Sequence, residues 1–254
     1  MRSSPFATLD RHLAAAPEVS HVSFLLAQDF AHRGLWGGPV PENSLAAASA
    51  AIAGGFGIEC DVRLATDGTV LVFHDADIQR MCGVPGQIEA LAASAIAALH
   101  LSGSEEPVPS LSDLLALIAG RTPLLIEIKT DGPAAAAICL AVRRTLEGYR
   151  GPVAVMGFNP EVSRWFATHA PRIVRGLVMQ ERDGLLDSVK RRLALWRAKP
   201  DFLAYDVRAL PSALPAALRS KGLPMLSWTV RTPVDRDIAA RHADRPIFER
   251  MAQV

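Results

Sequence analysis

The side chains best suited to chemistry in this sequence end, or nearly end, short apolar runs in its first half. They are His32, Arg33, Glu59, Asp61, His74, Asp75, Glu127 and Lys129. Side chains alternate along a strand, so Glu59 and Asp61 share one face, as do Glu127 and Lys129. Three carboxylates facing one space repel each other, and burial penalises each charge further. Either some are protonated or a cation holds them, and oxygen ligands without cysteine suit Mg²⁺ or Ca²⁺ better than zinc.

A divalent cation, two basic side chains and two histidines are the groups that cleavage of a phosphate diester requires. The cation and Arg33 would bind the phosphate and stabilise the charge that develops on it, since a guanidinium is a bidentate fork for phosphate oxygens. His32 and His74 would divide the proton transfers: one takes a proton from the nucleophile and the other protonates the leaving alkoxide. The pattern does not decide which histidine has which role, nor whether the nucleophile is a substrate hydroxyl or a metal-bound water.

Each of these features is weak by itself. A pair of acids two residues apart on a strand is common, a lone histidine is more often structural than catalytic, and the "EIK" at 127–129 is more often an ion pair. What favours a site is that four consecutive apolar runs all end in functional groups. Active sites of barrel enzymes lie at the carboxyl ends of the strands.

The elements that must position these groups alternate between strands and helices. We expect eight strands, at 29–34, 57–64, 69–75, 123–129, 152–158, 172–179, 201–207 and 223–230. Helical periodicity fills most of the gaps, at 44–54, 111–119, 133–147, 161–168, 185–197, 213–220 and 233–242. This alternation predicts a parallel sheet, and the count of eight favours a closed (β/α)8 TIM barrel. The alternative is an open doubly wound sheet, but no glycine-rich nucleotide-binding loop follows any strand.

Two places interrupt the alternation. Only the turn "ATDG" separates the second run from the third, and a long stretch at 76–109 follows the third. We expect this stretch to be a small insertion that covers one end of the barrel. The whole chain, 1–254, is then one catalytic domain, and "PIFE" near its end adds one short strand.

Composition narrows the class of protein. The 254 residues are 50% hydrophobic, and 27 basic side chains nearly balance 26 acidic ones, so no nucleic-acid partner is expected. Three cysteines without a metal or redox spacing indicate reduced thiols. No apolar stretch is long enough for a signal peptide or a membrane span. We therefore expect a cytoplasmic enzyme without an integral membrane segment; its oligomeric state is not predicted.

At this point the sequence resembles the glycerophosphodiester phosphodiesterase family of the phosphatidylinositol-phospholipase-C-like superfamily. The resemblance rests on "AHRG…PENS", "IECDV", "DGTVLVFHD", "PVPSL", "LLIEIK", "GFNP" and "SWTVRTP", in that order. It implies a TIM barrel with an insertion after the "HD" strand. The family commonly has other residues where Ser44, Cys60 and Gly157 stand, so a substrate contact at Gly157 is in doubt.

The resemblance also implies roles for individual residues. The catalytic pair is His32 and His74, the metal ligands are Glu59, Asp61 and Glu127, the phosphate contacts are Arg33 and Lys129, the aromatic residues near the alcohol are Phe158 and Trp228, and Glu42 and Asn43 lie beside the metal. For Phe158 and Trp228, a purely structural role in packing at the barrel mouth is an equal alternative to contact with the substrate.

The activity expected is that of a hydrolase in lipid and glycerol metabolism. With one Mg²⁺ or Ca²⁺, it would convert a glycerophosphodiester such as glycerophosphocholine to glycerol 3-phosphate and an alcohol. One alternative is a lysophospholipase D. The acyl chain of its lipid substrate would need an apolar groove, which the apolar face of the segment 87–101 could form. The other is a non-catalytic phosphate-binding barrel.

Overall fold

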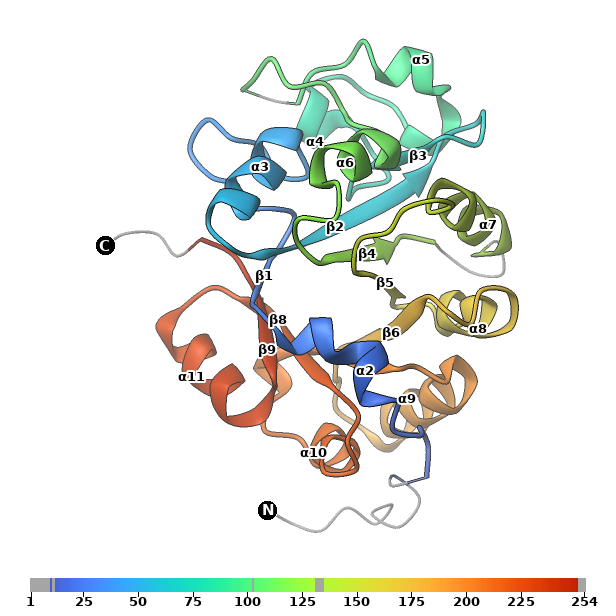
Figure 1. Cartoon of the computed structure of the whole chain (residues 1–254), viewed down its shortest axis with the longest axis vertical. Helices are drawn as coiled ribbons and strands as arrows, with labels where there is room; N and C mark the ends of the chain where they lie inside the picture. Colours follow the sequence, from blue (N-terminus) through green and yellow to red (C-terminus); the bar gives the residue numbers. More distant parts are fainter. Residues whose placement is uncertain (1–9, 11, 102, 131–134, 251–254) are drawn as a thin grey trace. The chain divides into compact units, whose positions relative to one another are not determined.

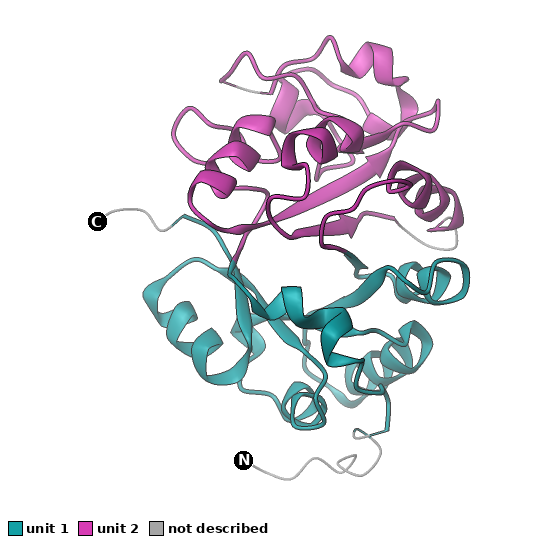
Figure 2. Ribbon diagram, in the orientation of Figure 1, with its two compact units in different colours: residues 1–29, 154–254 teal, residues 30–153 magenta. Residues whose placement is uncertain are grey.

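The computed structural model describes residues 10, 12–101, 103–130 and 135–250 (Figure 1). The fold is a (β/α)8 TIM barrel: a closed barrel of eight parallel strands with helices between them and one extra strand, as the sequence predicts. By their contacts the residues form two compact units, one of residues 1–29 and 154–254 and one of residues 30–153 (Figure 2). We describe each unit by itself.

The unit of residues 30–153 carries the first barrel strands and the insertion. Its elements are β1 (Phe30–Ala31), α3 (Leu45–Ala53), β2 (Gly57–Leu64), β3 (Val70–Val72), α4 (Gln79–Cys82), η2 (Ile88–Ala90), α5 (Ala93–Ile96), α6 (Leu111–Ile118), β4 (Leu124–Ile128) and α7 (Ala135–Thr145). Strand β2 pairs in parallel with β1 and with β4. Ser44 caps α3 and Ser110 caps α6, each accepting a hydrogen bond from a backbone N–H of the first turn.

The run at 69–75 is not a barrel strand, which corrects the strand assignment made from sequence. Strand β3 within it pairs antiparallel with β2, with Val72 opposite Val62. The four-residue turn "ATDG" explains this, because it can close a hairpin whereas a parallel connection needs a dozen residues or more. The remaining parallel strand is β9 (Arg245–Phe248), which contains most of the expected "PIFE" segment.

The hairpin has a consequence for the site. Because β3 runs back along β2, the residues after it return to the level of the acidic pair on β2. The backbone N–H of Phe73 donates to the carbonyl oxygen of Asp61 at 2.9 Å, which places His74 next to that level.

The insertion packs on this hairpin. Ile78, Ile88, Ile96 and Leu101 are buried in one apolar cluster with Phe73 and its neighbours. These apolar side chains of 76–109 are therefore used for packing. They do not line an open groove.

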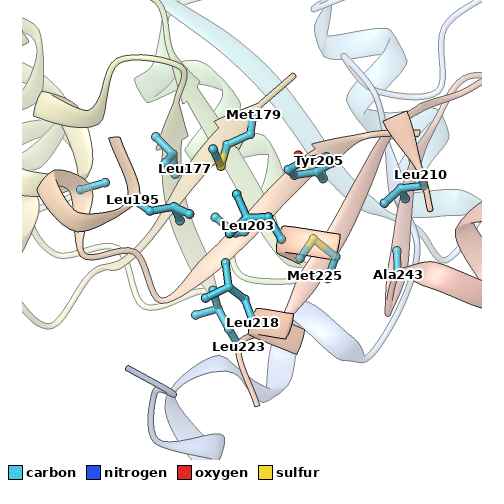
Figure 3. Close-up of a cluster of buried hydrophobic side chains, with 12 residues drawn as sticks. Leu177, Met179, Leu195, Leu203, Tyr205, Leu210, Leu218, Leu223, Met225 and Ala243 are labelled. Carbon is cyan, nitrogen blue, oxygen red and sulfur yellow. The ribbon is translucent and has the colours of Figure 1, made fainter. Parts of the chain in front are cut away.

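The second unit contains the other five barrel strands. Its elements are α2 (Val19–Val22), η1 (Ser23–Leu26), β5 (Val153–Gly157, whose first residue belongs to the other unit), α8 (Pro160–His169), β6 (Val174–Met179), α9 (Leu185–Ala198), β7 (Phe202–Asp206), η4 (Val207–Ala209), α10 (Ala213–Arg219), β8 (Met225–Val230), α11 (Pro233–His242) and β9. Strands β5 to β9 pair in parallel, each with the next along the chain. Figure 3 shows the apolar cluster between these strands and their helices, in which Leu203 of β7 lies near Leu195 of α9.

All three cysteines are free thiols. Among the described helices, none combines the length and the apolar character needed to cross a bilayer.

Candidate active site

Three carboxylates of the unit of residues 30–153 converge at one place. Glu59 and Asp61 project from the same face of β2, and Glu127 is the register partner of Asp61 on β4. All three are buried, and one oxygen of each lies within 4.8 Å of the others. The structure thus brings together the residues that the sequence singles out as metal ligands.

The closeness and burial of these carboxylates shift their pKa values. Burial, and then the charge of Asp61, raise the pKa of Glu59 to about 8. Burial also raises the pKa of Glu127. Burial acts in the same direction on Asp61, but Lys129 and Arg33 outweigh it and hold the pKa of that carboxyl below its ordinary value. Without a cation, Glu59 therefore keeps its proton at neutral pH.

The donor set fits a hard divalent cation. Its atoms are carboxylate oxygens only, and Oε1 of Glu59 is buried with no hydrogen-bond donor among the described residues. The ammonium of Lys129 supplies part of the positive charge, since it contacts Glu127 and lies 2.9 Å from Oδ1 of Asp61. A cation would complete the neutralisation of the remaining carboxylate.

Arg33 is fixed between the carboxylate cluster and the loop that follows β1. Its backbone N–H donates to Glu59 at 2.9 Å, its Nη1 donates to Glu42 at 2.8 Å, and its Nε lies 3.1 Å from Oδ2 of Asp61. Asn43 donates to the same Asp61 oxygen at 3.0 Å and accepts from the Asp61 N–H at 3.2 Å. The "PEN" segment therefore holds both the arginine and the aspartate in place.

The backbone of this loop is strained where it holds the site. Arg33 and Asn43 both have positive φ, at 58° and 56°, in the left-handed region that non-glycine residues rarely adopt. Gly34 follows at φ 77°, and a Cβ there would lie 2.8 Å from the backbone of Ala47. Glycine is thus required by conformation and by the close approach of α3.

The two predicted catalytic histidines have different surroundings. His32 follows β1 and is buried; its Nε2 lies 3.9 Å from Glu59, and its carbonyl accepts from the indole of Trp36 at 3.0 Å. His74 is more exposed, and its Nδ1 lies 2.6 Å from Oδ1 of Asp75.

Arg80, on α4 of the insertion, completes a chain of contacts to His74. Its Nε donates to Asp75 at 2.5 Å and its Nη2 donates to Glu42 at 2.6 Å. Burial favours the neutral carboxyl of Asp75, but the hydrogen bonds from Arg80 and His74 prevail and lower its pKa. An ionised Asp75 orients the His74 ring with a proton on Nδ1, which leaves Nε2 as the nitrogen with a free lone pair.

Phe158 and Trp228, expected near the alcohol of the substrate, belong to the other unit. Phe158 follows β5 and is exposed, and Trp228 is on β8. Their rings meet edge to face with centroids 5.3 Å apart. The indole N–H of Trp228 donates to the carbonyl of Ala204 at 2.9 Å, which fixes the ring.

Sequence reasoning missed the role of Asp75 and did not notice Arg80. Asp75 directly follows a candidate catalytic histidine, which was a usable signal. Arg80 carried no such signal. It lies in the insertion, outside any alternating strand pattern, and its partner Glu42 is 38 residues earlier in the chain.

The fold is a TIM barrel, and carboxylates, histidines and basic side chains gather at β2, β4 and the loops beside them. The chain belongs to the glycerophosphoryl diester phosphodiesterase family, whose model matches residues 32–249.

Two curated relatives match part of this chain. The Bacillus subtilis protein YqiK is 37% identical over 110 residues, 40% of this chain and 45% of that protein. A glycerophosphodiester phosphodiesterase of Bacillus altitudinis is 32% identical over 107 residues, 39% of this chain and 43% of that protein. Both matches thus span less than half of the curated relatives.

Among solved structures, an Oleispira antarctica phosphodiesterase in complex with the product sn-glycerol-3-phosphate is similar over 90% of this chain and 94% of that one. Its TM-score is 0.78 and its sequence identity 21%. This likeness supports the fold.

Proposed function

We propose that this protein is a divalent-cation-dependent phosphodiesterase that hydrolyses glycerophosphodiesters to glycerol 3-phosphate and an alcohol. The observation that carries the proposal is the convergence of Glu59, Asp61 and Glu127 in the part of the chain that also holds His32 and His74. The family membership and the product bound to the Oleispira structure support the same substrate class. Because the family match extends over both compact units, we also propose that residues 1–254 act as one catalytic domain.

Glu59, Asp61 and Glu127 would hold the cation, Mg²⁺ or Ca²⁺. When bound, the cation would neutralise charge on a phosphate oxygen and on the developing transition state. Arg33 and Lys129 would add positive charge on the same phosphate. Arg33 suits this role because Glu42 and Asp61 already fix its guanidinium, so little side-chain entropy is lost when substrate binds.

We propose that His74 is the base and His32 the acid. Burial lowers the pKa of His74 against the opposing charge of Asp61, so its ring is neutral at neutral pH and Nε2 can accept a proton from the nucleophile. The nucleophile is either a water, which gives glycerol 3-phosphate directly, or a neighbouring substrate hydroxyl, which gives a cyclic phosphate that a water then opens. As the new P–O bond forms and the bond to the leaving alcohol breaks, His32 would donate a proton to the leaving oxygen. Its Nε2 lies 3.9 Å from Glu59, beside the carboxylates that would hold the cation.

Phe158 and Trp228 would contact the alcohol part of the substrate. An edge-to-face aromatic pair offers an apolar surface and a π-face, which suits a quaternary or primary ammonium such as that of choline or ethanolamine. No observation favours a lysophospholipase D, since Ile88, Ile96 and Leu101 of the candidate acyl-binding segment are buried in packing.

The test is turnover of a panel of glycerophosphodiesters with added Mg²⁺, Ca²⁺ or chelator, with glycerol 3-phosphate as the measured product. We expect release with at least one cation, loss of release with chelator, and loss in His32→Ala and His74→Ala. Wild-type rates in both histidine variants would refute the site, and a folded protein without turnover under any cation would favour a phosphate-binding barrel.

A further inference from the structure

Helix α9 exposes an apolar face that nothing in the described structure covers. Its exposed apolar side chains are Leu185 (68% exposed), Leu186 (78%), Val189 (39%), Leu193 (58%) and Trp196 (60%). Their spacing of three and four residues puts them on one side of the helix. We call these five residues the α9 stripe. Isolated exposed apolar residues are normal, but a contiguous set of this size marks an interaction surface.

Other residues of α9 attach the helix firmly to the protein. Leu195 and Ala198 are buried in the cluster of Figure 3. Arg192 forms a buried ion pair with Asp10, at 2.7 and 2.8 Å. The helix therefore cannot turn its stripe inward without breaking these contacts, and the stripe is a fixed surface.

Charges of opposite sign lie at the two ends of the stripe. Glu181 and Asp183 precede the helix, whereas Arg197 and Lys199 are at its end. Glu181 and Arg197 are engaged within the chain, with Arg191 and with Glu161 of α8. Asp183 and Lys199 are exposed at opposite ends.

We infer that the α9 stripe is the contact surface for a second copy of this chain, packed with the two α9 helices antiparallel. An antiparallel arrangement about a two-fold axis places Trp196 of each copy near Leu185 of the other, with Val189 and Leu193 near the axis. It also places the basic end of each helix against the acidic end of its partner, so Lys199 and Asp183 face each other twice. Aromatic and aliphatic residues at the centre, with charges at the rim, are typical of protein interfaces.

The same charges argue against a lipid surface. Helices that lie on membranes are rich in lysine and arginine along the polar border, because anionic lipids attract them. Here Lys190 and Arg197 border the stripe on one side, but Glu181, Asp183 and Asp187, with Arg182 among them, make one end of it acidic. An anionic bilayer would repel that end, whereas a second copy complements it.

The first experiment measures the mass of the full chain in solution by light scattering and sedimentation from about 1 to 100 µM. We expect a dimer that Leu193→Glu and Trp196→Glu each convert to monomer, with a dissociation constant raised at least 100-fold. Val234→Glu is the matched control: Val234 is 66% exposed on α11, so its replacement should leave the dimer unchanged. Circular dichroism of each variant shows that the fold is retained.

The second experiment reverses charges at the two ends. Asp183→Lys alone and Lys199→Glu alone should each raise the dissociation constant, because each places like charges together. The double variant should restore dimerisation, and a control reversal at Glu147, on a different part of the surface, should have no effect.

Three results would overturn the inference: a monomer across this range, a dimer insensitive to Leu193→Glu, or a monomer that binds vesicles of anionic phospholipid through the stripe. None depends on catalytic activity, so the outcome is independent of the proposed function.

Discussion

His74 and Asp75, neighbours in the chain, form a hydrogen-bonded pair of 2.6 Å between Nδ1 and a carboxylate oxygen. Arg80 holds the second oxygen of the same carboxylate. The histidine that we propose as the catalytic base is thus oriented by a carboxylate that a side chain of the insertion holds in turn.

Loss of the Asp75 carboxylate should misalign His74. We expect Asp75→Asn to lower kcat about 100-fold with little change in KM, because the amide no longer fixes the ring tautomer. Arg80→Met should lower kcat about 10-fold through the same carboxylate. Steady-state kinetics measure both effects. Asp77→Asn, in the same loop, is the control, and an equal loss there would mean that the loop is simply disturbed.

The two histidines should respond differently to the leaving group. If His32 is the acid, His32→Ala should lower kcat/KM about 10³-fold for a phosphodiester of choline. The loss should be far smaller for a p-nitrophenyl phosphodiester, whose leaving group needs no proton. His74→Ala should lose similar factors with both. Comparing kcat/KM for the two substrates measures this. If instead His74→Ala were the variant sensitive to the leaving group, His74 would be the acid and His32 the base.

Cation binding should stabilise the protein more at pH 8 than at pH 6. The raised pKa of Glu59, about 8, means that the folded chain keeps a proton that the unfolded chain, with a pKa near 4.5, has lost. Between about pH 4.5 and pH 8, the contribution of Glu59 to the stability of the fold therefore falls as pH rises. The raised pKa of Glu127 acts in the same direction. The lowered pKa of His74 opposes them only near pH 6.5 and below.

The measurement is Tm with chelator and with excess Mg²⁺ or Ca²⁺ at each pH. Since Glu59 must release its proton to bind a cation, the increase in Tm on adding cation should grow with pH. Glu59→Gln should abolish the increase. An increase that is independent of pH would contradict the protonated state of the cluster.

Replacement of Gly34 separates two causes of destabilisation. Gly34→Ala should lower the free energy of unfolding by about 3 kcal/mol, from a positive φ and from the contact with Ala47. Gly55→Ala, at φ 74° with open space around it, should cost only about 1 kcal/mol from the backbone. Urea denaturation measures both. Equal losses would mean that the Ala47 contact relaxes freely.

The sequence by itself determined the barrel and the identities of the carboxylates. Alternating apolar runs and helical periods are local properties, and the two-residue period of a strand puts Glu59 and Asp61 on one face whatever the strand pairs with. The short turn at 65–68 also indicated a hairpin between β2 and β3, although the presence of eight apolar runs favoured eight parallel strands.

Only the tertiary structure decided the place of β9 as the remaining parallel strand, the contacts of Arg80, and the exposure of the α9 stripe. Each depends on which distant segments meet. Leu193 and Leu195 have the same side chain and lie two residues apart, yet one is exposed and the other buried. A helix rotates neighbouring residues to different sides, and packing against β6 and β7 selects the side that is covered.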